Sequence, residues 1–311
     1  MRSFLRLRPV RHILVTSAVV LIACAAVFVV QLLEFSAAQA QVRGITAQAT
    51  ATVVRTDDDL VTVRFPVAGG RDATADVQLD STAPKNGTTV PVLYDPAQPS
   101  RALIRDATPI VTADRATTYA TVTVVAAAAV LAIDAFFLFT RFLRPARAAA
   151  SAPVSVRRVK LQRGVLTRSW IETETAVPRW IPVYFSPTLI GLPAPAKVVL
   201  HGDVRRDRHV AVSVGDELLY PAGAVRTTEP RGRRTDNPAE PDDERSLAAA
   251  RPVSLARQFR ADLPVLAVAP VVAAFWAFVD GSGFDGWLVV TVLVAAFGFW
   301  WAALRGSDPS L

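Results

Sequence analysis

Four long apolar runs constrain the fold of this chain more than any other feature. The first, residues 13–33, would span roughly 30 Å as a helix at about 1.5 Å per residue, which matches the hydrocarbon core of a bilayer. The others cover residues 117–140, 263–279 and 287–304, and only the stretch DGSGFDG separates the last two. We therefore predict a membrane protein with four transmembrane α-helices, the last two forming a tight hairpin.

The composition agrees with membrane spans joined to small polar domains. Of the 311 residues, 51% are hydrophobic and only 20% are charged, which does not fit one large soluble core. The single cysteine, Cys24, excludes a disulfide framework and lies in an apolar run, as expected for an inert buried thiol. The formal net charge of +7 suggests nucleic acid at first sight, but its uneven placement favours membrane orientation, so we expect no nucleic-acid partner.

The charges beside the apolar runs predict an orientation, because Lys and Arg are retained on the cytoplasmic side. Residues 1–12 hold four arginines and no acid, and residues 141–168 hold eight basic residues and no acid. Residues 34–116, in contrast, hold ten acidic residues against eight basic ones. We expect a multi-pass protein of the plasma membrane with both termini in the cytoplasm and residues 34–116 outside.

The N-terminal span can be read in two further ways. We expect residues 13–33 to be an uncleaved signal anchor, because 21 apolar residues exceed the usual signal-peptide core of about 7 to 15. The pattern Ala38-Gln39-Ala40 also suits a signal peptidase, and cleavage there would leave three spans. The box LIAC, residues 21–24, resembles a lipoprotein processing site, but the apolar run continues beyond it.

Residues 44–106 predict a small extracytoplasmic β-domain. Two alternating, Val-rich runs flank Asp57, Asp58 and Asp59 and indicate a hairpin. The stretches ADVQLD and TTVPVLYD supply two more strands. The two-residue period puts Tyr94 on the core face of the last strand, whereas Pro91 indicates an edge strand or a bulge.

The stretch VPVLYDPAQPSRALI, residues 90–104, carries the pattern V-x-V-x-Y-D-P-x-x-P. In this it resembles a domain of unknown function found in bacterial, in particular actinobacterial, integral membrane proteins, where a small β-domain precedes a transmembrane helix. The resemblance covers roughly residues 44–105 and implies no activity. We interpret Tyr94, Asp95, Pro96 and Pro99 as a structural motif, because Asp before Pro suits a turn and the two prolines end the strand.

The remaining sequence predicts a second small β-domain at residues 153–225, on the cytoplasmic side. Its stretches VSVRRVKLQ, WIPVYF and HVAVSVGDELLYP cluster β-forming residues between Gly and Pro signals. Residues 227–255 are rich in Pro and mixed charge, so we predict a disordered linker there.

Few side chains are candidates for chemistry. Asp134 lies inside an apolar run, where an acid is costly and is a functional candidate by default. Arg141, Arg144 and Arg147 follow that run and could contact lipid headgroups, although ordinary cytoplasmic retention of basic residues accounts for them more simply. The acids at 57–59 suggest Ca²⁺, and His201 with His209 suggests zinc, but neither has the usual ligand spacing, so we expect no metal, cofactor or catalytic residue.

These observations favour a non-enzymatic integral membrane scaffold or partner-binding protein of the cell envelope. Its expected partners are the lipid bilayer and other membrane or envelope proteins, and its oligomeric state is open. A transporter or channel accessory component that uses Asp134 is the alternative.

Overall fold

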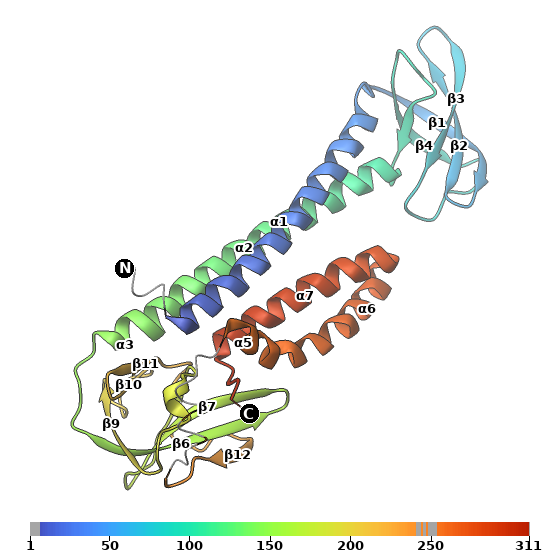
Figure 1. The fold of residues 1–311 in the computed structure, drawn as a ribbon. Helices are drawn as coiled ribbons and strands as arrows, with labels where there is room; N and C mark the ends of the chain where they lie inside the picture. Colours follow the sequence, from blue (N-terminus) through green and yellow to red (C-terminus); the bar gives the residue numbers. More distant parts are fainter. Residues whose placement is uncertain (1–6, 241–243, 245–246, 248–253, 311) are drawn as a thin grey trace. The chain divides into compact units, whose positions relative to one another are not determined.

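The structure, a computed structural model, describes residues 7–240, 244, 247 and 254–310 (Figure 1). Chain contacts divide it into two compact units, Ala25–Ala126 on the one hand and Met1–Cys24 with Ala127–Leu311 on the other. Residues 1–6 of the predicted basic N-terminus lie outside the described residues, as do 241–243, 245–246 and 248–253 of the predicted linker.

The described residues contain four helical segments that are long and apolar enough to cross a membrane, as predicted. They are Arg8–Val42, Thr108–Ala146, Leu255–Asp280 and Gly283–Arg305. The first is a single helix, α1, and the last is α7. Both α1 and the second segment extend well beyond the apolar runs 13–33 and 117–140, because polar residues continue the helix at the ends of each run.

The second and third segments change helix type along their length. The second consists of α2 (Thr108–Leu138), a π-helical turn η2 (Phe139–Leu143) and α3 (Arg144–Ala146). The third consists of α5 (Leu255–Asp262), a 3₁₀ stretch η4 (Leu263–Val268) and α6 (Ala269–Asp280). Pro264 and Pro270 lie in the first turns of η4 and α6. Backbone N–H groups in a first turn have no partner within the helix, so a proline there costs no hydrogen bond. Gly281, with φ of 67°, ends α6 before α7 begins.

The first β-domain is a five-stranded antiparallel sheet in the order β3-β2-β1-β4-β5. Its strands are β1 (Ala47–Asp57), β2 (Leu60–Val67), β3 (Arg71–Gln78), β4 (Thr89–Tyr94) and β5 (Ala102–Ile104). Asp58, with φ of 50°, makes the predicted acidic turn between β1 and β2, where Asp57 pairs with Leu60. Pro91 is tolerated inside β4 because β5 pairs with it only from Val92 onward.

The edges of this sheet meet, which encloses its core. Leu79, after β3, bridges Ala107, after β5, and the N–H of Asp80 donates to the carbonyl of Asp106. Inward-facing residues of all five strands pack together between them, with Phe65 and Val92 almost fully buried. Alternate residues along β1 and β2 are buried, which is the period that the sequence predicted.

The second β-domain has a larger antiparallel sheet in the order β11-β10-β9-β6-β7-β8, with β12 paired to β6. Its elements are β6 (Val154–Arg163), β7 (Leu166–Thr173), β8 (Trp180–Val183), a 3₁₀ turn η3 (Pro187–Leu189), β9 (Ala196–His201), β10 (Ala211–Val214), β11 (Glu217–Leu219) and β12 (Arg233–Asp236). Backbone hydrogen bonds join Trp180 to Arg226 and Tyr184 to Tyr220. The segment after β11 therefore lies against β8 and closes the sheet on itself.

The structure corrects part of the linker prediction. Residues 233–236, which the composition assigned to a disordered segment, form β12 and pair with Val159–Gln162 of β6. Arg234 explains the strand, because its guanidinium contacts three carboxylates, those of Glu172, Glu229 and Asp236, at 2.7 to 2.8 Å. From composition we expected these charges to be solvated, whereas in the structure they form ion pairs.

Candidate functional site

The Tyr-Asp-Pro motif of the first β-domain lies at the end of β4. Tyr94 is buried, and its ring centroid lies 5.1 Å from that of Phe65. The Oδ1 atom of Asp95 accepts a hydrogen bond from the N–H of Ala97 at 2.9 Å, which closes the turn that Pro96 begins. These contacts are architectural.

The second carboxylate oxygen of Asp95 connects this turn to helix α1. It accepts a hydrogen bond from Arg101 at 3.3 Å, and Arg101 donates to the backbone carbonyls of Gln41 and Arg43 at 2.9 and 3.1 Å. Gln41 lies in the last turn of α1 and Arg43 directly follows it, where backbone carbonyls have no partner within the helix. The motif and Arg101 therefore join the β-domain to the helix that precedes it.

Asp134, the predicted intramembrane acid, is buried among three helices. Its Oδ2 atom accepts a hydrogen bond from Ser17 of α1 at 2.6 Å, and its Oδ1 atom accepts one from the indole N–H of Trp300 of α7 at 2.9 Å. Apolar residues of the same three helices, among them Val20, Val130 and Ala296, belong to one buried cluster with Trp300. Asp134 thus links three apolar segments that are far apart in the sequence.

A second buried acid, Asp262 at the end of α5, was not found from the sequence. It is fully buried, and its Oδ2 atom lies 3.1 Å from Nε2 of His12 in α1. Both side chains are almost inaccessible, and the distance allows an ion pair when His12 is protonated. His12 lies four residues before Thr16 and five before Ser17, so polar groups continue along α1 from this pair to Asp134.

The three arginines considered as possible lipid-headgroup contacts have different environments. Arg144 and Arg147 are exposed, at the start and just after the end of α3. Arg141 instead points into the protein, where it donates to the hydroxyl of Tyr184 at 3.2 Å and to the carbonyls of Ala222 and Leu304 at 3.0 and 2.5 Å.

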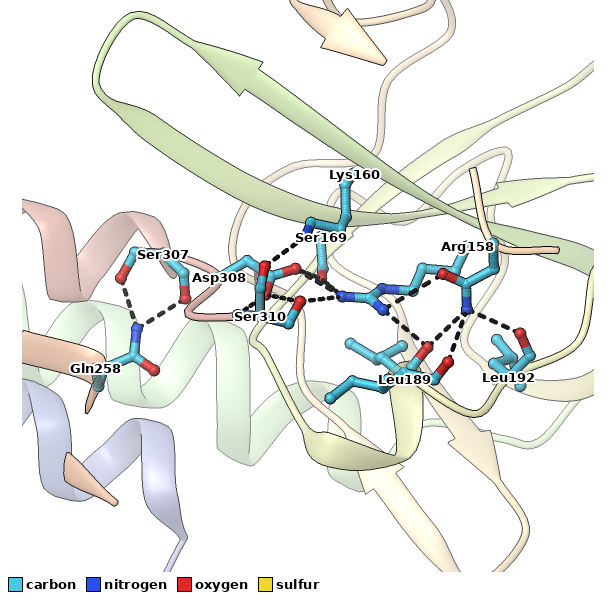
Figure 2. A network of polar contacts seen from close by, with 11 residues as sticks. Arg158, Lys160, Ser169, Leu189, Leu192, Gln258, Ser307, Asp308 and Ser310 are labelled. Atoms are coloured by element: carbon cyan, nitrogen blue, oxygen red, sulfur yellow. Dashed lines mark hydrogen bonds and ion pairs between the residues drawn. The ribbon is translucent and has the colours of Figure 1, made fainter. Parts of the chain in front are cut away.

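A polar network joins the second β-domain to the C-terminal tail (Figure 2). Arg158 of β6 and Asp308 form a buried ion pair with 2.7 Å between Nη2 and Oδ2, and Ser169 donates to the same oxygen at 2.6 Å. Arg158 also donates to Ser310 at 3.0 Å and to the carbonyl of Leu189 at 3.1 Å. The sequence offered no signal for this network, because its members are scattered over 150 residues.

Burial by itself would raise the pKa of Asp308, since it disfavours the charged form. Arg158 and the hydrogen bonds from Ser169 and Ser310 outweigh that effect, and the pKa of Asp308 is lowered. Asp308 therefore stays ionised, and its negative charge balances the buried guanidinium.

The tail is also held from the side of the helices. Gln258 of α5 donates to the carbonyl and to the hydroxyl of Ser307, at 2.8 and 2.6 Å, and the N–H of Asp308 donates to the carbonyl of Thr167 in β7. In Figure 2 Ser307 faces Gln258, while Asp308 and Ser310 face Arg158. A few residues after α7 thus connect α5 and the sheet.

The residues between His201 and His209, which include Asp203 and Asp207, form a turn. Asp207 accepts from the N–H of Asp203 at 2.8 Å, and His201 contacts the hydroxyl of Ser213 at 2.7 Å. Burial lowers the pKa of His209 to about 4, with a further contribution from Arg141, Arg208 and Arg144. Within the part of the chain that the structure describes, no three His, Cys, Asp or Glu residues are grouped so that they could hold a metal ion.

No family model, no curated protein and no solved structure matches this chain. What the candidate residues share is that polar side chains join elements far apart in the sequence.

Proposed function

We propose that this chain is a non-enzymatic integral protein of the cell membrane that presents one β-domain on each side and binds partner proteins through them. The proposal includes cytoplasmic termini, an outer first β-domain and a cytoplasmic second one. Its support comes from the flanking charges and from the four apolar helical segments.

The observation that carries the proposal is the attachment of the second β-domain to the helices. The Arg158–Asp308 ion pair, with side-chain exposures of 2% and 0%, holds the tail after α7 against β6. Arg141 of η2 reaches the end of α7 at Leu304 and the sheet at Ala222. Polar groups that would serve chemistry elsewhere are here used to fix a domain on a helical base, as a scaffold requires.

Partner binding is tested by site-specific photo-crosslinking in cells. A photo-reactive residue is placed at Arg64 on β2 or at Lys197 on β9, both exposed, with Val122 on α2 as a control position. We expect discrete crosslinked proteins from positions 64 and 197 and a different pattern from position 122. Absence of crosslinks across the surfaces of both domains, or turnover of ester, peptide or phosphoester substrates by the purified protein, would contradict the proposal.

Orientation is tested by labelling single cysteines with a membrane-impermeant maleimide in a Cys24→Ala background. Lys85 and Arg205 are exposed and suit as probe positions in the two β-domains. We expect position 85 to be labelled in intact cells and position 205 only after lysis. Labelling at position 205 in intact cells would reverse the orientation.

A transporter or channel accessory component is the second candidate. It is favoured by the buried acids Asp134 and Asp262 and by His12, since ionisable residues inside apolar helices mark ion pathways in many membrane proteins. An Asp134→Asn variant that supports full function in a deletion strain would exclude this candidate. Loss of function together with a normal amount of folded protein would favour it over the scaffold.

A further inference from the structure

Arginines from separate parts of the chain converge at the junction of the second β-domain and the helices: Arg141 of η2, Arg168 of β7, Arg226 of the closing segment and Arg305 at the end of α7. Shared contacts connect the first two. Arg141 and Arg168 both donate to the carbonyl of Ala222, at 3.0 and 3.2 Å.

Arg226 lies near the same aromatic ring as Arg168, and Arg305 is the neighbour in sequence of a residue that Arg141 contacts. The guanidinium of Arg226 lies 5.7 Å from the centre of the Trp170 ring, and that of Arg168 lies 5.2 Å from it. Arg305 directly follows Leu304, whose carbonyl accepts from Arg141. We call Arg141, Arg168, Arg226 and Arg305 the arginine cluster.

The described residues place no acid in an ion pair with this cluster, in contrast to Arg158. Asp134, seven residues before Arg141 in the same helical segment, accepts instead from Ser17 and Trp300. The acceptors at the cluster are neutral carbonyls and one tyrosine hydroxyl.

Two further features of the cluster favour binding of an anion. The Nε atoms of Arg141 and Arg168 are buried and have no hydrogen-bond acceptor within the described parts of the chain. Burial lowers the pKa of Arg168 to about 10, and repulsion from Arg305, Arg141 and Arg226 adds to this effect. A negative charge at the cluster would relieve that repulsion.

We propose that the arginine cluster binds a phosphate group, presented by the headgroup of an anionic phospholipid. Guanidinium groups match phosphate geometry and bind it with paired hydrogen bonds. Arg226 and Arg305 are exposed and can receive the phosphate, whereas Arg168 is less accessible. Arg305 ends a segment that is apolar enough to cross a membrane, and Arg141 lies near the end of another, so the choice of a lipid as the source rests on the proposed membrane placement.

The test uses the purified full-length chain in a neutral detergent. Its thermal unfolding is followed while short-chain phosphatidylglycerol, short-chain phosphatidylcholine or inorganic phosphate is added. The variants are Arg226→Gln, Arg305→Gln and the double variant, with Arg205→Gln as a charge-matched control on the exposed turn after β9. Circular dichroism without additive checks that each variant folds as the wild type does, which we expect because both side chains are exposed.

We expect phosphatidylglycerol, but not phosphatidylcholine, to raise the midpoint of unfolding of the wild type and of Arg205→Gln. Each arginine removed should weaken the apparent affinity about fivefold, as expected for a cation near an anionic headgroup. An equal effect of inorganic phosphate would support the phosphate site and overturn the lipid as its source. No shift with any additive, or an unchanged response of the double variant, would overturn the site. Cysteine labelling tests the membrane placement separately.

Discussion

Arg158 and Asp308 form an ion pair 2.7 Å long inside the second β-domain, although 150 residues separate them in the sequence. Both side chains are almost fully buried. Removing one partner leaves a charge without a counter-charge in the protein interior, which is far more unfavourable than losing a surface ion pair. The junction between the sheet and the C-terminal tail therefore depends on this contact.

An Asp308→Asn substitution should destabilise the second β-domain by about 3 to 5 kcal/mol, because it leaves Arg158 without its carboxylate. Chemical denaturation in detergent, with limited proteolysis of this domain as a second readout, measures the effect. Arg55→Gln, which removes an exposed ion pair with Asp57, is the control and should change little. Equal effects of the two substitutions would show that the buried pair contributes no more than a surface one.

The bonds of Asp134 should stabilise the packing of α1, α2 and α7. Trp300→Phe and Asp134→Leu each remove the 2.9 Å hydrogen bond between the indole and the carboxylate. A double-mutant cycle should give a coupling free energy of about 0.6 to 1.7 kcal/mol, the range of hydrogen bonds between membrane helices. Substitutions of Ser17, which donates to Asp134, and of Val130, which belongs only to the buried apolar cluster of these helices, supply a matched comparison. Additive effects of the Trp300 and Asp134 substitutions would contradict the coupling.

Gln31 of α1 should tolerate an apolar replacement with a gain in stability. Its Oε1 atom is buried and accepts no hydrogen bond from any residue that the structure describes. Gln31→Leu removes this unsatisfied group and should stabilise the fold by about 1 kcal/mol. Gln258→Leu is the contrasting change, because Gln258 donates to Ser307 twice, and it should destabilise. Thermal unfolding of the two variants in the same detergent decides the comparison.

The pKa of His209 should be near 4 in the folded protein, well below its ordinary 6.5. Between these values the unfolded chain binds a proton that the folded chain does not, so stability should fall as the pH is lowered from about 6.5 to about 4. Selective ring labelling for NMR can follow this titration, because the chain has only three histidines. His209→Gln should flatten the dependence of stability on pH over the same window, and an unchanged slope would contradict this origin.

Gly44 should be needed for the junction between α1 and the first β-domain. Its φ is 89°, and an added Cβ would lie 2.9 Å from Oδ2 of Asp95, the atom that binds Arg101. Gly44→Ala should therefore destabilise by more than the roughly 1 kcal/mol of backbone strain. Gly87→Ala isolates that strain, because Gly87 has φ of 82° and open space around its Cα. Equal losses for the two variants, measured by denaturation, would rule out a role of the contact with Asp95.

Local patterns predicted most of the long elements. Apolar runs long enough for a bilayer predicted four helical segments, and the alternation around Asp58 predicted the hairpin of β1 and β2. Helix lengths were harder to predict, since the polar ends of α1 and α2 carry no hydrophobic signal. The strand β12 was missed because its pairing with β6 is stabilised by charges, which composition assigns to solvent.

The sequence by itself determined the apolar helical segments and most of the strands, because both depend on patterns of a few residues. Only the tertiary structure decided which polar side chains meet. Asp134 with Trp300, His12 with Asp262, Arg158 with Asp308 and the arginine cluster all combine residues far apart in the chain. Such pairs leave no local pattern, since what brings their members together is the burial of apolar surface around them and the need of a buried polar group for a partner.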